Sequence, residues 1–214
     1  MLIIGHRGAC GLEPENTLRS VQRAMDLGVD MVEIDIYEHE GRLIVMHDET
    51  LDRTTNGVGK YSDYSLDHLR KLDAGKGERI PYLEEVIELI RDKVGLNIEI
   101  KGRGVVPLLH RMIHSDDGFL VSSSDWAQLS EYRQLSSEIA LGVLGKDPFE
   151  VARKLNAYSV HPGLIRLTDE YMRQAREGGL QVFAHSVKSD KDWDLVRNFK
   201  VDGCFVNDPS TFHA

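Results

Sequence analysis

The stretch Met31-Val32-Glu33-Ile34-Asp35-Ile36-Tyr37 alternates apolar and acidic side chains with the period of a β-strand. Because successive side chains of a strand point to opposite faces, Glu33 and Asp35 share one face and the aliphatic residues share the other. The segment Leu96-Asn97-Ile98-Glu99-Ile100-Lys101 repeats this pattern. We expect the aliphatic faces to pack against helices. The acidic faces, with Lys101, then point into the interior of a curved sheet.

Short apolar or alternating segments recur along the whole chain, and amphipathic stretches typical of helices lie between most of them. The expected strands are Leu2–Gly5, Met31–Tyr37, Leu43–His47, Leu96–Lys101, Phe119–Ser123, Ala140–Leu144, Ala157–His161, Gln181–Ser186 and Gly203–Asn207. The residues expected to begin helices are Asn16 or Thr17, Ser65, Asp125, Thr168 and Asp190. This alternation predicts an α/β fold.

The second and third expected strands are separated only by Glu38 to Arg42, which is too short for a crossover and predicts a hairpin. Counting the hairpin once gives eight β units, the number in a (β/α)8 TIM barrel. A doubly wound open sheet is the competing fold, since alternation does not demonstrate closure. We expect residues 48–79 to form a small insertion after the second β unit, over one end of the barrel, with a helix near Ser65–Leu72. The chain, 1–214, is then expected to be a single domain.

Composition narrows the class of protein. The chain has 214 residues, 41% of them hydrophobic, which is typical of a folded globular protein. Its formal net charge of −9 argues against nucleic acid and anionic membranes as partners. Two cysteines are too few for a disulfide framework or a cysteine zinc site. The sequence has no apolar run of about 18 residues and opens without a basic leader, so we expect no membrane insertion and a cytoplasmic location.

Inward carboxylates on neighbouring strands repel each other, by roughly 3 kcal/mol for a pair about 5 Å apart at an effective dielectric constant near 20. Three of them require a compensating cation, and an all-oxygen donor set favours Mg²⁺ or Ca²⁺ over zinc. The expected ligands of one such divalent cation are Glu33, Asp35 and Glu99. The alternative is that these carboxylates form structural ion pairs with Arg7, Lys101 or Arg53.

Two histidines, His6 and His47, stand where an apolar strand segment meets a loop. Active sites of barrels gather at one such rim, and imidazoles can serve as general base and general acid near neutral pH. Arg7 offers a planar guanidinium that suits phosphate oxygens, and Lys101 offers a further charge. A lone histidine at a strand end is more often a hydrogen-bonded polar residue without a catalytic role. The catalytic hypothesis therefore depends on the pair occurring with the carboxylates. Arg53 is expected to be structural, holding the insertion.

A series of spaced motifs runs through the first half of the chain. They are His6-Arg7-Gly8, Pro14-Glu15-Asn16-Thr17, Glu33-Ile34-Asp35, His47-Asp48, Leu51-Asp52-Arg53-Thr54-Thr55, Leu72-Asp73-Ala74-Gly75, Ile80-Pro81 with Leu83-Glu84-Glu85, and Asn97-Ile98-Glu99-Ile100-Lys101. In type and order they resemble the glycerophosphodiester phosphodiesterase family. The segments Tyr158–Pro162 and Asp202–Pro209 are similar to later strands of that family.

The resemblance implies a TIM barrel of the phospholipase-C-like phosphodiesterase type, with a small insertion after the second β unit. It implies an enzyme that hydrolyses glycerophosphodiesters to sn-glycerol 3-phosphate and an alcohol. The residues matching its metal ligands are Glu33, Asp35 and Glu99, those matching its acid–base pair are His6 and His47, and those matching its phosphate contacts are Arg7 and Lys101. Either histidine can be the acid, and the nucleophile is either water or a hydroxyl of the substrate.

One segment departs from the family pattern. His185-Ser186-Val187-Lys188 stands where the family usually has a Trp-Thr-Val-Asn type of sequence, which replaces an aromatic wall by polar groups and adds a positive charge. A related phosphodiesterase acting on another diester, of lysophospholipid type, is therefore an alternative. A binding protein without activity and a metal-dependent lyase or isomerase are the further alternatives, although neither explains the histidines together with Arg7. The sequence does not indicate the oligomeric state.

Overall fold

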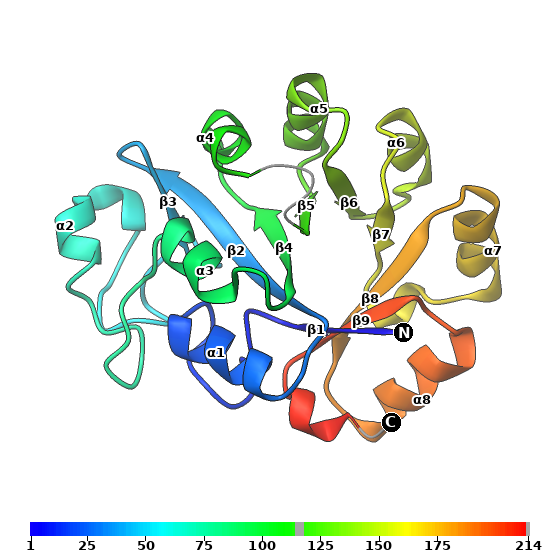
Figure 1. Ribbon diagram of the computed structural model, residues 1–214, viewed down its shortest axis with the longest axis horizontal. Helices are drawn as coiled ribbons and strands as arrows, with labels where there is room; N and C mark the ends of the chain where they lie inside the picture. The colour runs from blue at the N-terminus through cyan, green and yellow to red at the C-terminus, as the bar shows by residue number, and fades with distance from the viewer. Residues whose placement is uncertain (114–117, 213–214) are drawn as a thin grey trace.

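The chain folds into alternating strands and helices (Figure 1), and the computed structural model describes residues 1–113 and 118–212. The strands are β1 (Leu2–Gly5), β2 (Met31–His39), β3 (Arg42–Val45), β4 (Gly95–Ile100), β5 (Phe119–Ser123), β6 (Ala140–Leu144), β7 (Ser159–His161), β8 (Gln181–Val187) and β9 (Gly203–Val206). The α-helices are α1 (Leu18–Asp26), α2 (Leu66–Leu69), α3 (Leu83–Ile90), α4 (Val105–Met112), α5 (Trp126–Leu135), α6 (Phe149–Lys154), α7 (Asp169–Glu177) and α8 (Asp190–Phe199). Single turns of 3₁₀ helix are η1 (Tyr61–Asp63), η3 (Leu164–Arg166) and η4 (Pro209–Thr211).

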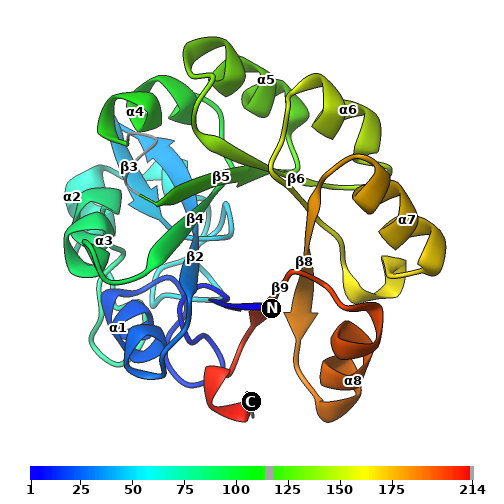
Figure 2. The same cartoon turned by 45° about the vertical axis from the view of Figure 1, so that its right-hand side comes forward.

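The sheet is a closed barrel. Its strand order is β1-β9-β8-β7-β6-β5-β4-β2-β3, and an additional pairing of β1 with β2 closes the ring. All pairings within the ring are parallel, whereas β3 pairs antiparallel with β2 as the hairpin partner predicted from the short connection. The helices surround the strands (Figure 2). Closure confirms the predicted TIM barrel and excludes the doubly wound open sheet.

Local sequence signals explain where most helices begin. Side chains of Thr17, Ser65, Asp125 and Thr168 accept hydrogen bonds from the first turns of their helices, as predicted. The cap of helix α8 is Ser189, one residue before the expected cap Asp190, which is the first residue of the helix. Helices α4 and α6 lie in stretches where the sequence pattern predicted none. Both are short, and each has a proline in or just before its first turn, where the missing N–H costs little.

The core has two layers. The aliphatic residues of β2 and β4, including Ile34 and Ile98, are fully buried against the helices, as the alternation predicts. Inside the barrel, a separate cluster of Ile4, Leu120, Phe183 and Phe205 fills the interior. Ile4 pairs with Met31, two residues before Glu33 on the same face of β2. This interior cluster therefore lies next to the acidic residues, on the side of the amino ends of the strands, and closes that end of their site.

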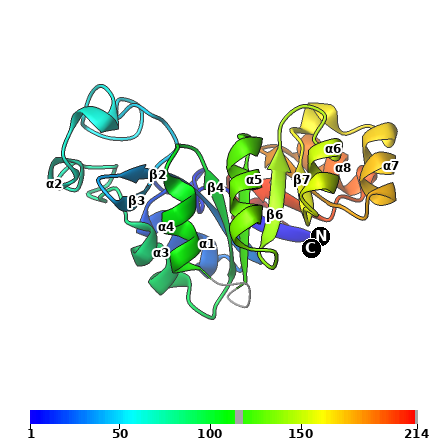
Figure 3. The same cartoon turned by 90° about the horizontal axis from the view of Figure 1, so that it is seen from above.

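Residues 48–79 lie beside the β2–β3 hairpin at the edge of the molecule (Figure 3). Their helix, α2, falls within the predicted Ser65–Leu72 range. Leu51 and Leu69 are fully buried and pack with Ile44 and Ile80 in a small apolar cluster of their own. The chain as one domain, with these residues as an insertion, stays a prediction. No helix in the described part of the chain is long and apolar enough to cross a membrane.

Candidate active site

The carboxyl ends of the first strands bring the predicted site residues together. His6 and Arg7 follow β1, Glu33 and Asp35 lie in β2, His47 follows β3, and Glu99 and Lys101 lie in and just after β4. A cavity of about 250 Å³ opens at this rim. The predicted residues that line it are His6, Arg7, Glu33, His47, Glu99 and Lys101. A larger cavity, of about 630 Å³, lies at the other end of the strands and contains none of them.

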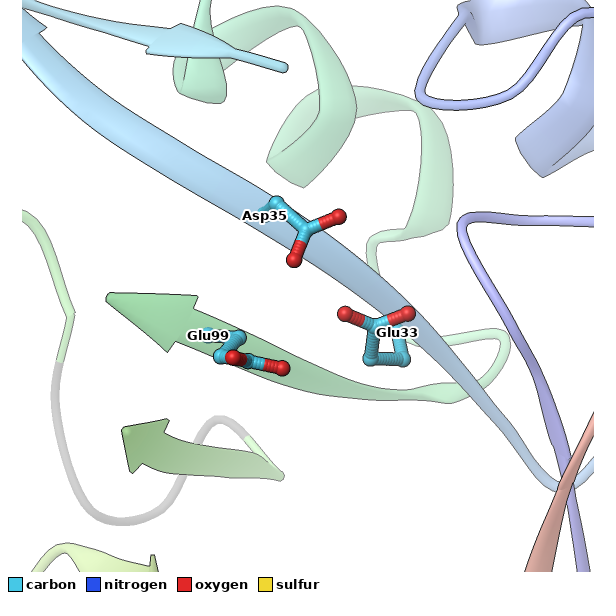
Figure 4. A group of neighbouring side chains, drawn as sticks. All are labelled: Glu33, Asp35 and Glu99. Atoms are coloured by element: carbon cyan, nitrogen blue, oxygen red, sulfur yellow. The ribbon is translucent and has the colours of Figure 1, made fainter. Parts of the chain in front are cut away.

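The three carboxylates point toward one another from two adjacent strands (Figure 4). Asp35 of β2 pairs directly with Glu99 of β4, and Glu33 lies two residues earlier on the same face. One ligand oxygen from each of them lies within 4.8 Å of the others. Glu33 and Asp35 are 1% exposed and Glu99 is 9% exposed. The residues are thus close enough for one ion to contact all three.

Burial makes this group costly without a cation. Burial, followed by the charges of Asp35 and Glu99, raises the pKa of Glu33 well above its usual value. Burial and Asp35 likewise raise the pKa of Glu99. One oxygen of Glu33, Oε1, is buried and has no hydrogen-bond partner. An unpartnered carboxylate oxygen beside two further carboxylates fits a hard divalent cation, so the donor set agrees with a divalent metal site.

Two cations pair with the carboxylates, as the structural alternative expected. Arg7 Nε lies 3.3 Å from Asp35 Oδ2, and Lys101 Nζ lies 3.0 Å from Asp35 Oδ1 and also contacts Glu99. Burial opposes charge on Lys101, but Asp35 and Glu99 outweigh it and raise the pKa of its ammonium. These cations offset two of the three negative charges. Arg53, the third expected partner, contacts none of the triad and binds Glu15 and Asp48 instead.

The turn after β1 aims Arg7 and requires a glycine. Gly8 has a φ of +79°, and a Cβ there would lie 2.1 Å from Ser20 Oγ. That hydroxyl donates to the carbonyl of Arg7 over 2.5 Å, which ties the turn to helix α1. The backbone N–H of Arg7 donates to Glu33 Oε2 over 2.8 Å. The turn therefore orients the guanidinium of Arg7 and the carboxylate of Glu33 together.

Both histidines are held through Nδ1. His6 Nδ1 lies 2.8 Å from Asn207 Oδ1, and His47 Nδ1 lies 2.6 Å from Asp48 Oδ1. Each oxygen accepts a hydrogen bond from a protonated Nδ1, and this tautomer leaves Nε2 with its lone pair. Burial, and then the charge of Arg7, lowers the pKa of His6 to about 4. His6 is therefore neutral near pH 7.

Several supporting residues were not predicted as part of the site. Asn207 orients His6, Asp48 orients His47, and Glu15 accepts a hydrogen bond from Arg7 Nη1 over 2.7 Å. Asn16 Nδ2 donates to Asp35 Oδ2 over 2.9 Å, and its Oδ1 accepts from the Asp35 N–H. The motifs Pro14–Thr17 and His47-Asp48 contain three of these four residues. Their acidic and amide groups beside predicted site residues were the available signal.

The opposite wall of the cavity comes from the later strands. Its lining residues are Leu144, His185, Ser186, Lys188 and Phe205. The register of β8 against β9 shifts between Ala184 and Val187, which redirects the chain at this wall. His161 lies deeper, 1% exposed, with Nε2 2.9 Å from Ser159 Oγ. Burial lowers the pKa of His161 to about 3, so it is a neutral core residue.

Comparison with known proteins agrees with this geometry. The model of the glycerophosphoryl diester phosphodiesterase family matches residues 6–211. A glycerophosphodiester phosphodiesterase of Caldanaerobacter subterraneus is 36% identical to the chain, over 98% of this chain and 95% of its own length. A glycerophosphodiester phosphodiesterase of Bacillus subtilis is 30% identical over 100% of this chain and 85% of its own length.

Solved structures agree as well. The structure of an Oleispira antarctica phosphodiesterase in complex with the product sn-glycerol 3-phosphate has a TM-score of 0.89 and 29% identity, over 98% of this chain and 94% of that one. The structure of a glycerophosphodiester phosphodiesterase of Thermotoga maritima has a TM-score of 0.86 and 26% identity, over 98% of this chain and 96% of that one. The chain therefore belongs to the glycerophosphoryl diester phosphodiesterase family and is a phosphoric diester hydrolase that acts on glycerophosphodiesters.

Proposed function

We propose that the chain hydrolyses glycerophosphodiesters to sn-glycerol 3-phosphate and an alcohol in the rim cavity, with one Mg²⁺ or Ca²⁺ ion. The observation that carries this proposal is the convergence of three buried carboxylates from β2 and β4, with His6 and His47 lining the same cavity. The product bound to the Oleispira relative supports the same reaction here. The cytoplasmic location stays a prediction.

The proposed ligands of the ion are Glu33, Asp35 and Glu99, because their oxygens lie within 4.8 Å of one another. Such an ion, when bound, supplies Lewis acidity that polarises a phosphoryl oxygen and lowers the pKa of a hydroxyl or water. Arg7 and Lys101 are the proposed phosphate contacts. Together with a dication they outnumber the three carboxylate charges, so the cavity attracts a singly charged phosphodiester despite the acidic composition of the chain.

The two histidines are proposed to carry the proton transfers. One accepts the proton of the nucleophile, which is either water or a hydroxyl of the substrate, and the other donates a proton to the departing alkoxide. Asn207 and Asp48 fix both rings with the Nε2 atom available. A diester with a nitrophenolate leaving group needs no acid. Of the two variants His6→Gln and His47→Gln, we expect only one to recover activity on this substrate. That variant is the one that lacks the general acid.

The test is hydrolysis of glycerophosphocholine, followed by release of glycerol 3-phosphate. We expect turnover to stop after complete chelation with EDTA and to return when Mg²⁺ or Ca²⁺ is added in excess. A Glu150→Gln variant alters an exposed acid on α6 that forms an ion pair with Lys154, and as the control it should respond to EDTA as the wild type does. Unchanged turnover in metal-free enzyme would contradict the proposed role of the ion.

The alcohol side of the substrate has a second candidate, a diester of lysophospholipid type. The observation in its favour is that His185 and Lys188 line the cavity wall in place of an aromatic residue. A panel of diesters that share glycerol 3-phosphate and differ only in the alcohol separates the two candidates. We expect glycerophosphodiesters with small headgroups to be the better substrates, and a preference for acylated substrates would favour the second candidate.

A further inference from the structure

Arg53 lies in the stretch between β3 and α2 and bonds two carboxylates at once. Its Nε donates to Asp48 Oδ2 over 2.6 Å. Its Nη1 and Nη2 donate to Glu15 Oε2 and Oε1 over 2.7 and 2.8 Å. A guanidinium is a rigid planar fork, so bonds through three nitrogens fix the relative orientation of Glu15 and Asp48.

Each of these carboxylates also accepts a hydrogen bond from a residue that lines the cavity. Asp48 Oδ1 lies 2.6 Å from His47 Nδ1, and Glu15 Oε1 accepts a hydrogen bond from Arg7 Nη1 over 2.7 Å. Arg7 in turn lies against Asp35. A continuous series of charged contacts therefore runs from His47 through Arg53 to the acidic triad.

We propose that Arg53 is a positioning residue that holds the acid–base group His47 and the phosphate contact Arg7 in one arrangement. It acts through Asp48, which fixes the ring and tautomer of His47, and through Glu15, which fixes the guanidinium of Arg7. The inference rests on the proposed function, because it assumes those two roles. It assigns Arg53 a task beyond holding residues 48–79 in place.

The surroundings of Arg53 argue against a purely structural task. Its side chain is 48% exposed, and exposed ion pairs contribute little to stability. The residues around it are held by an apolar cluster in which Leu51 and Leu69 are fully buried. The hydrogen bond from Arg53 is the main cause that lowers the pKa of Asp48. Asp48 therefore remains an anion that accepts a hydrogen bond from His47 Nδ1.

The experiment compares Arg53→Ala and Arg53→Lys with Arg173→Ala. Arg173 is a matched control, because it bonds two glutamates, Glu170 and Glu177, on the outer helix α7, none of whose residues lines the cavity. We expect Arg53→Ala to lower kcat/KM about 10- to 100-fold, with a lower kcat and a higher KM. We expect its melting temperature to stay close to that of the control.

Two further readouts distinguish positioning from stability. Arg53→Lys restores charge without the fork, so we expect it to recover only a minor part of the loss, whereas free guanidinium ion should restore activity to Arg53→Ala. Adding Arg53→Ala to His47→Gln should cost less than it costs in wild type, because the two residues act together. Activity within twofold of wild type, full recovery by lysine, or a fully additive double variant would each overturn the inference. Inactive wild-type enzyme would instead refute the proposed function.

Discussion

The two halves of the barrel interior differ in chemistry. On the side of β2 and β4, inward positions near the rim carry charged groups, namely Glu33, Asp35 and Glu99. On the side of β7 to β9, they carry rings, and His161, Phe183 and Phe205 pack against one another at centroid distances of 5.1 to 5.5 Å. One half therefore has the groups that bind ions, and the other supplies a wall of rings to which Lys188 adds one positive charge.

This division separates the expected chemistry from the expected selectivity. The charged half has a buried carboxylate oxygen without a partner and two histidines held through Nδ1. The ring half places Lys188 and His185 against the same cavity, on the side where no carboxylate of the triad lies. We therefore expect changes in the charged half to abolish the reaction, and changes in the other half to alter which alcohol is accepted.

The largest expected effect comes from the triad. Glu33→Gln or Glu99→Gln keeps the shape of the side chain but removes a charged ligand. We expect kcat/KM for glycerophosphocholine to fall at least ~1000-fold, because the lost charge stabilisation is several kcal/mol. Excess metal should recover part of the loss. Near-normal activity in either variant would remove that residue from the metal site and erase the contrast between the halves.

The next largest effect is expected from the histidines, whose substitution should lower kcat more in the charged half than in the opposite half. His47→Gln and His6→Gln should each lower kcat about 100-fold, as expected for loss of general acid or base catalysis. His185→Gln, on the opposite wall, should lower it less than about tenfold. Steady-state kinetics on one substrate compares all three. An equal loss for His185→Gln would assign a proton transfer to the ring half as well.

Lys188 allows a finer test of the selectivity wall. Its side chain lines the cavity, while its backbone N–H donates to Asp192 Oδ2 over 2.9 Å. Lys188→Glu should shift the ratio of kcat/KM for glycerophosphoserine over glycerophosphocholine by about 3- to 10-fold toward the choline ester, the scale of a two-charge change in high dielectric. An unchanged ratio would show that Lys188 does not sense the alcohol.

The smallest expected effect is on stability and comes from the buried ring of His161 in the opposite half. The pKa of His161 is lowered by burial to about 3, so the unfolded chain binds one more proton between pH 6.5 and that value. Stability from the neutral ring is therefore complete above pH 6.5 and is lost as the pH falls. In His161→Gln, urea unfolding between pH 7 and 4.5 should show a pH slope smaller by up to ~1.4 kcal/mol per unit. An identical slope would contradict a neutral, buried His161.

The sequence predicted the barrel and the first contacts of its site because both follow from strand periodicity. Alternation in β2 and β4 places Glu33, Asp35 and Glu99 on one face, and parallel register then makes Asp35 and Glu99 neighbours. The hairpin of β3 followed from a connection too short for a crossover. Strand alternation and the length of a connection can each be read from one short segment of sequence.

Contacts between distant loops were not predictable in the same way. Asn207 reaches His6 across 201 positions of the chain, and Arg53 reaches Glu15 across 38. No periodicity specifies such pairs, since they depend on how the loops at the rim fold over one another. Arg53 was expected to hold the insertion, and its bonds to Glu15 and Asp48 emerged only with the loops in place. The roles of the site residues stay predictions.

The central claim is that three carboxylates of β2 and β4 bind one divalent cation in the cavity beside the two histidines. The most direct measurement is anomalous diffraction from crystals soaked with Mn²⁺, a substitute for Mg²⁺, together with sn-glycerol 3-phosphate. We predict a single strong peak within bonding distance of carboxylate oxygens of Glu33, Asp35 and Glu99, with the phosphate near Arg7. A peak at another place, or none at saturating Mn²⁺, would contradict the account.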